Sequence, residues 1–137
     1  MDRILVVDDD PALRSLLKLV ATRAGFDVDT ARDGVEALEK LTANDYLIAV
    51  IDLMMPRING YDLVQRLGSF ERRPAVLVVT AMHDAHVPRL DGNVVNSILR
   101  KPFDIEMFSA VLTELATALR AGKPMPNVLS FPAQSGE

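Results

Sequence analysis

Carboxylates follow two short apolar stretches of the sequence, at the point where each stretch ends. Residues 46–51 are followed by Asp52, and residues 4–7 are followed by three successive aspartates at positions 8–10. Short apolar runs rich in Ile and Val are typical of strands that are buried on both faces of a sheet. Parallel strands end at one edge of an open α/β sheet, where ligands bind. Carboxylates gathered there raise one another's pKa values, so we expect this acidic cluster to hold a cation.

Two further strand patterns end in polar residues that suit phosphoryl transfer. Residues 75–79 lead to Thr80, and residues 94–99 lead to Lys101. Asp52 is predicted to be the nucleophile, because a carboxylate can attack phosphorus and form an aspartyl phosphate. The Lys101 ammonium would neutralise charge on the phosphoryl oxygens, and the Thr80 hydroxyl would donate a hydrogen bond to one of them.

Magnesium is the cation that these side chains favour. Asp9 and Asp52 offer hard oxygen ligands, and Mg²⁺ binds through a few carboxylates while it keeps several waters. Each residue also has an ordinary explanation, since an aspartate after a strand is commonly a turn or cap residue, as we expect for Asp10. Their joint placement, each at the end of an apolar strand, is what favours a phosphoryl-transfer site.

Strand and helix patterns alternate along the chain, which indicates parallel βα units. Residues 26–31 alternate apolar and polar side chains, so we place this strand at an edge of the sheet. Residues 53–60 are predicted to form a loop, and residues 81–93 at most a short or irregular helix. Recognisable caps mark the expected helix ends: Asp10 before Pro11, Gly25, the capping box of Asp33 and Glu36, and Asp104 between the staple residues Phe103 and Phe108.

The composition is that of an ordinary folded protein. Of the 137 residues, 49% are hydrophobic and 25% are charged, which is enough for one domain with a core. The net charge of -4 does not favour nucleic acid or an anionic membrane, and no apolar run is long enough to span a bilayer. The absence of cysteine excludes disulfides and thiolate metal sites. We expect a cytoplasmic protein with one domain over residues 1–121 and a flexible tail over residues 122–137.

Together these motifs resemble the receiver (CheY-like) domain of bacterial two-component response regulators. The resemblance covers about residues 3–120. It is carried by residues 4–11 (ILVVDDDP), 33–34 (DG), 52–56 (DLMMP), 59–60 (NG), 80–81 (TA) and 101–103 (KPF). It implies a flavodoxin-like three-layer sandwich, an α/β fold whose doubly wound, five-stranded parallel sheet has the strand order 2-1-3-4-5.

The resemblance also implies a function in phosphorelay signal transduction. Asp52 would accept a phosphoryl group from a sensor histidine kinase or a phosphotransfer protein, and would do so without being part of a turnover enzyme. Phosphorylation would shift a conformational equilibrium that controls binding to a downstream protein, to an output domain or to a second copy of the chain. Asp9, Asp52 and the main-chain carbonyl of Met54 would ligate Mg²⁺, with Asp8 nearby.

The sequence leaves two alternatives open. Receivers commonly carry Tyr or Phe three positions before the lysine, where this chain has Ile98. A degenerate receiver that acts as an unphosphorylated interaction module therefore remains an alternative. A haloacid-dehalogenase-like phosphatase is another, since residues 8–10 contain an Asp-x-Asp, but it leaves Asp52 without a role.

The resemblance to the receiver family further implies a cis peptide bond between Lys101 and Pro102.

Overall fold

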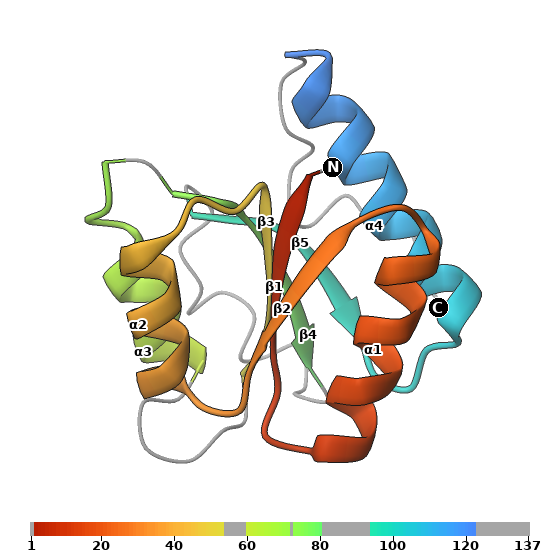
Figure 1. Ribbon diagram of the computed structural model, residues 1–137, viewed down its shortest axis with the longest axis horizontal. Helices are drawn as coiled ribbons and strands as arrows, with labels where there is room; N and C mark the ends of the chain where they lie inside the picture. The colour runs from red at the N-terminus through yellow and green to blue at the C-terminus, as the bar shows by residue number, and fades with distance from the viewer. Residues whose placement is uncertain (1, 54–59, 72, 81–93, 123–137) are drawn as a thin grey trace.

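The computed structural model of the chain describes residues 2–53, 60–71, 73–80 and 94–122. Within these residues, five parallel strands form one sheet in the order β2-β1-β3-β4-β5 (Figure 1). The strands are β1 (Arg3–Val7), β2 (Asp27–Ala31), β3 (Ile48–Asp52), β4 (Ala75–Thr80) and β5 (Val95–Arg100). The predicted strand order is therefore confirmed.

Helices cover both faces of the sheet, which makes three layers. The described helices are α1 (Pro11–Arg23), α2 (Gly34–Ala43), α3 (Gly60–Leu67) and α4 (Ile105–Arg120). In Figure 1, α1 and α4 lie on one side of the sheet and α2 and α3 on the other. Each side has its own apolar core, and the largest buried side chains include Phe108 of α4 and Leu63 of α3. This is the doubly wound fold that the alternating patterns predicted.

The burial of each strand follows its place in the sheet. Every residue of the central strands β3 and β4 is buried, because helices cover both of their faces. β2 lies at the edge, where Asp27 is exposed and Asp29 and Thr30 are only partly buried. The edge position predicted from the alternation of residues 26–31 is confirmed.

The predicted caps start the helices where expected. The Asp33 side chain accepts a hydrogen bond from Glu36 N at 2.8 Å. The reciprocal bond of the capping box is displaced by one residue, because Glu36 Oε1 accepts from Arg32 N. Before α4, the rings of Phe103 and Phe108 lie 6.2 Å apart around the Asp104 cap, as a hydrophobic staple requires. Asp10 likewise accepts from two main-chain nitrogens of α1, and Gly25 follows that helix with a φ of 101°.

Arg3, Asp29 and Tyr46 form a network near the amino ends of β1, β2 and β3. Arg3 Nη2 donates to Asp29 Oδ2 at 2.6 Å, and the Tyr46 hydroxyl donates to the same oxygen at 2.7 Å. Burial by itself would raise the pKa of Asp29, but the two hydrogen bonds together with the positive charges of Arg3 and Lys40 outweigh burial and lower that pKa. Burial and the Asp29 carboxylate raise the pKa of Tyr46 to about 12. The network joins β1, β2 and the segment just before β3, away from the carboxyl ends of the strands.

Some predictions fall on residues outside the described ranges. These are the irregular segment 81–93, the tail over most of residues 122–137, and Met54. The boundary between domain and tail stays a prediction. None of the helices in the described ranges is long and apolar enough to cross a membrane.

Ser97 offers a test of the core under α1 and α4. It is fully buried in β5, opposite Leu77 of β4, and its hydroxyl has no hydrogen-bond partner among the described residues. Because folding removes this hydroxyl from water without a replacement, we expect Ser97→Ala to raise the free energy of unfolding by about 1 kcal/mol. Urea unfolding measures the change. Ser69→Ala is the control, since the exposed Ser69 hydroxyl donates to the carbonyl of Arg66; a loss of stability in Ser97→Ala alone would contradict the prediction.

Candidate functional site

Three aspartates meet at the carboxyl edge of the sheet. Asp52 is the last residue of β3, while Asp8 and Asp9 follow the neighbouring strand β1. One carboxylate oxygen from each residue lies within 4.8 Å of the others. Asp8 and Asp52 are buried and Asp9 is exposed, so the cluster opens to solvent on the side of Asp9. The strand order reverses direction between β1 and β3, which is where doubly wound sheets bind ligands.

A lysine stands beside this cluster. Lys101 follows β5, and its Nζ lies 3.5 Å from Asp52 Oδ2, with 28% of the lysine side chain and 5% of the aspartate side chain exposed. Lys101 N donates to the carbonyl of Thr80 at 2.7 Å, so the end of β4 holds the lysine near the site. Thr80 itself is fully buried at the end of β4. The peptide bond between Lys101 and Pro102 is cis, as the family pattern implied.

The environment of Asp8 disfavours its charged form. Burial, together with the nearby charges of Asp52 and Asp9, raises the pKa of Asp8 to about 6. A hydrogen bond from Asp10 N to Asp8 Oδ1 and the charge of Lys101 offset only part of this. The other oxygen, Asp8 Oδ2, is buried and has no hydrogen-bond partner among the described residues.

These observations fit a hard divalent cation. An oxygen that is buried without a donor is costly unless something positive compensates for it. Mg²⁺ accepts carboxylate oxygens and keeps waters, and the exposed side at Asp9 leaves room for them. Asp8, Asp9 and Asp52 are the described residues that would hold the ion, and at that place it would neutralise charge on phosphoryl oxygens.

Gly60 brings the start of α3 against the main chain of Asp52. Gly60 N donates to the carbonyl of Leu53 at 3.1 Å. A Cβ at this position would lie 2.5 Å from the carbonyl oxygen of Asp52 and would also meet Leu53 Cα. The sequence pattern predicted a loop ending at Gly60, but this close approach to Asp52 could not be inferred from the turn signal alone.

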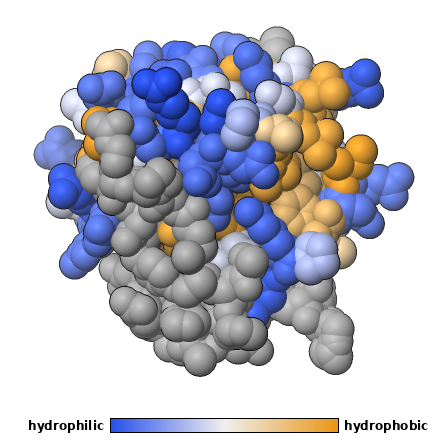
Figure 2. Space-filling view, turned by 90° about the horizontal axis from the view of Figure 1, so that it is seen from below, coloured by the Kyte–Doolittle hydropathy of each residue, from blue (hydrophilic) through white to orange (hydrophobic). Residues whose placement is uncertain are grey.

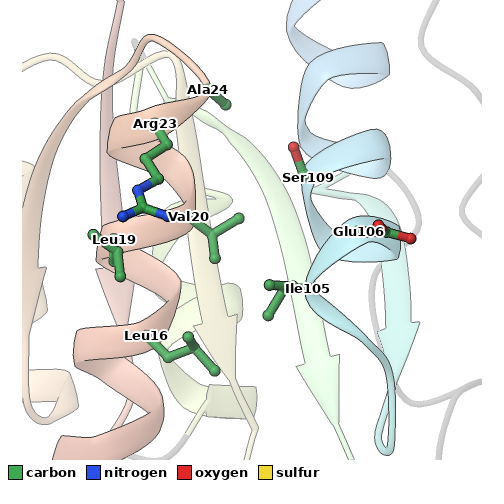
Figure 3. A pocket seen from close by; sticks show the side chains of 8 residues that line it. All are labelled: Leu16, Leu19, Val20, Arg23, Ala24, Ile105, Glu106 and Ser109. Atoms are coloured by element: carbon green, nitrogen blue, oxygen red, sulfur yellow. The ribbon is translucent and has the colours of Figure 1, made fainter.

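Among the described residues, the exposed large apolar side chains gather on α1 and α4. Leu16, Leu19 and Ile105 are 40%, 48% and 47% exposed, and they line a groove between α1 and α4 (Figure 3). Figure 2 shows the molecule from the end that lies lowest in Figure 1, and apolar residues gather there to the right. The groove contains Arg23 and Glu106 but none of the three clustered aspartates. The groove and the acidic cluster therefore share no residue.

Fold and site together define a doubly wound parallel α/β protein with a carboxylate cluster and a lysine at its switch point. A family model described as the response regulator receiver domain matches residues 4–113. The chain belongs to this family. The receiver family is therefore assigned in place of the haloacid-dehalogenase-like phosphatase.

Relatives and solved structures agree with this assignment. The chain is 35% identical over 108 residues to the response regulator ArlR of Staphylococcus aureus, which covers 77% of this chain and 48% of ArlR. It thus spans about half the length of the curated relatives that it matches. The receiver domain of the Francisella response regulator 1452 is similar with a TM-score of 0.78 and 28% identity, covering 87% of this chain and 99% of that domain.

A second solved structure contains bound ligands. It is the response regulator TrrA from Thermotoga maritima in complex with Mg²⁺ and BeF, with a TM-score of 0.75 and 29% identity over 83% of this chain and 98% of TrrA. The comparison with TrrA shows a similar fold in a protein that binds magnesium.

Asp8→Asn should stabilise the metal-free protein in a pH-dependent way. The ordinary pKa of aspartate is 3.8 and that of Asp8 in the fold is about 6, so the folded state binds one more proton between these values. Stability contributed by Asp8 therefore falls as pH rises through about 6. We expect Asp8→Asn to raise the free energy of unfolding by up to about 3 kcal/mol at pH 8 and by much less at pH 4. Urea unfolding with a chelator present measures this; equal effects at both pH values would contradict it.

Gly60→Ala should disturb the site through the main chain. The added Cβ meets only backbone atoms of Asp52 and Leu53, so one of the two segments has to move. We expect a loss of roughly 1–3 kcal/mol in unfolding free energy and weaker Mg²⁺ binding, measured by urea unfolding and calorimetry. Gly68→Ala is the control, because its Cβ would meet its neighbours at 3.2 Å or more, at the other end of α3. Unchanged Mg²⁺ affinity in Gly60→Ala would show that α3 does not position Asp52.

Proposed function

We propose that this chain is the phosphoacceptor of a phosphorelay and that Asp52 is the residue that receives the phosphoryl group. The observation that carries the proposal is the meeting of three carboxylates and the Lys101 ammonium at one edge of the sheet. A cation site beside a carboxylate nucleophile is the arrangement that phosphoryl transfer to aspartate needs. Membership of the receiver family supports the same reaction.

The transfer consists of one displacement at phosphorus. An oxygen of Asp52 attacks the phosphorus of a phosphohistidine in the donor protein. The bond between phosphorus and the donor nitrogen breaks, and its electron pair leaves with the imidazole ring. Lys101 stands 3.5 Å from Asp52 and neutralises charge on the transferred group. Thr80, at the end of the adjacent strand, donates a hydrogen bond to a phosphoryl oxygen.

Magnesium completes this site in our proposal. Asp8, Asp9 and Asp52 hold the ion, and Mg²⁺ supplies neutralisation of the charge that builds on the phosphoryl oxygens. The carbonyl of Met54, which lies outside the described residues, is the further ligand that the family pattern implies. Metal binding also favours the ionised form of Asp8, which the fold by itself disfavours.

Phosphorylation then shifts an equilibrium between two conformations. Ile98 stands where many receivers have an aromatic residue, and it is buried in the core between β5 and α3, opposite Val78. A buried β-branched side chain has little rotamer freedom, so we propose that the signal is carried by main-chain shifts near Thr80 and Lys101. The chain is a signalling domain and not a turnover enzyme in this proposal. A sensor kinase or phosphotransfer protein is its donor, and a downstream protein or output domain is its target.

Asp52→Asn should abolish modification. We expect the wild-type protein with Mg²⁺ to take up one phosphoryl group from acetyl phosphate, measured by intact-mass spectrometry, because Asp52 supplies the attacking oxygen. The Asp52→Asn variant has an amide in place of this nucleophilic carboxylate and should remain unmodified. Glu39→Gln is the control, because it removes one negative charge from an exposed position on α2 and should be modified like the wild type.

Two results would contradict this proposal. An unmodified wild-type protein that also shows no change with beryllofluoride would identify the chain as a degenerate receiver. Continued release of phosphate from a phosphate monoester over many turnovers would identify an enzyme instead.

A further inference from the structure

Arg14, in the first turns of α1, contacts the strand end that presents the acidic residues. Arg14 Nη1 donates a hydrogen bond of 2.9 Å to the main-chain carbonyl of Asp8. β1 ends at Val7, so this carbonyl lies one residue beyond the strand. Backbone carbonyls at such a place need a donor, because the sheet no longer supplies one. The guanidinium of Arg14 supplies it from six residues further along the chain.

The turn that Arg14 contacts has a demanding shape. Neighbouring side chains of an extended strand point to opposite faces of the sheet. Asp8 and Asp9 are neighbours, yet an oxygen from each lies within 4.8 Å of the other and of Asp52. The chain therefore has to bend here. The bend is held by Asp10 N, which donates to Asp8 Oδ1 at 2.9 Å, and by the contact from Arg14.

We propose that Arg14 is a positioning residue of the metal site, which holds the turn between β1 and α1 in the shape that lets Asp8 and Asp9 face Asp52. The proposal rests on the function proposed above and names the residue that sets the geometry of its metal ligands. Residues that orient metal ligands without touching the metal commonly change metal affinity about 10–100-fold when they are lost. Arg14 touches the backbone of a ligand residue and acts in this way.

Geometry and charge predict opposite results when Arg14 is removed. Arg14 is a cation near an acidic site, so removal of its charge alone would strengthen the binding of any divalent cation. Loss of positioning would weaken binding instead. The two cations Mg²⁺ and Ca²⁺ separate the effects further, because Mg²⁺ demands near-ideal octahedral geometry while Ca²⁺ accepts flexible coordination. A loosely held turn should therefore cost Mg²⁺ more affinity than Ca²⁺.

The test is calorimetric titration of Arg14→Met with Mg²⁺ and with Ca²⁺, in the absence of any phosphoryl donor. We expect Mg²⁺ affinity to fall about tenfold and Ca²⁺ affinity to fall clearly less. Lys18→Met is the matched control, because it removes the same charge from an exposed position one turn later on α1. We expect Lys18→Met to leave the ratio of the two affinities unchanged.

Arg14→Lys keeps the charge but replaces the guanidinium, and it decides the matter if Arg14→Met does not fold. We expect it to lower Mg²⁺ affinity several-fold while Ca²⁺ affinity stays near that of the wild type. Unchanged or stronger Mg²⁺ binding, or an equal loss for both cations, would overturn the positioning role. If the wild type itself binds no Mg²⁺, the proposed function fails first; if the wild type binds Mg²⁺ and is phosphorylated but the Arg14 variants behave like it, only this inference fails.

Discussion

The central constraint on this structure is the repulsion among three carboxylates that are confined at the ends of two neighbouring strands. Parallel pairing of β1 and β3 brings Asp8, Asp9 and Asp52 within 4.8 Å of one another. Two of them are buried, so water cannot compensate for their charge. Lys101 beside Asp52 and a main-chain donor to Asp8 offset part of this charge, whereas Asp8 Oδ2 has no hydrogen-bond partner among the described residues. The negative charge that is not offset favours the binding of a cation, and a bound cation can in turn neutralise charge on a ligand.

Several segments of the fold contact the acidic residues or the lysine beside them. The end of β4 holds the backbone of Lys101, which places an ammonium beside Asp52. The absence of a side chain at Gly60 lets α3 begin directly against the main chain of Asp52. α1 reaches back through Arg14 to the carbonyl of Asp8. The start of α3 and Arg14 of α1 thus lie against the main chain of two of the acidic residues, and the end of β4 contacts the main chain of Lys101.

The sequence predicted the parts of this arrangement that depend on local pattern. Apolar runs ending in aspartate predicted the buried strands and the acidic edge, and the caps at Asp33 and Asp104 act within a few residues of themselves. Contacts that depend on register could not be predicted in this way. The bond between Arg3 and Asp29 spans 26 residues and exists because β1 and β2 pair in one particular register. In the sequence, Arg14 is an ordinary basic residue of an amphipathic helix. Its contact with the carbonyl of Asp8 depends on the three-dimensional shape of the turn that precedes the helix.

The two ends of the described chain lie together, far from the acidic cluster. Asp2 precedes β1 and pairs with Arg120 in the last turn of α4. In Figure 1, the start of β1 and the end of α4 lie in the upper part of the molecule. The carboxyl ends of the strands, with the three aspartates, lie at the opposite end. A fluorescent reporter or a second folded unit joined beyond either residue would consequently start on the far side of the molecule. Such fusions would leave the end of the molecule that carries the three aspartates accessible from solvent.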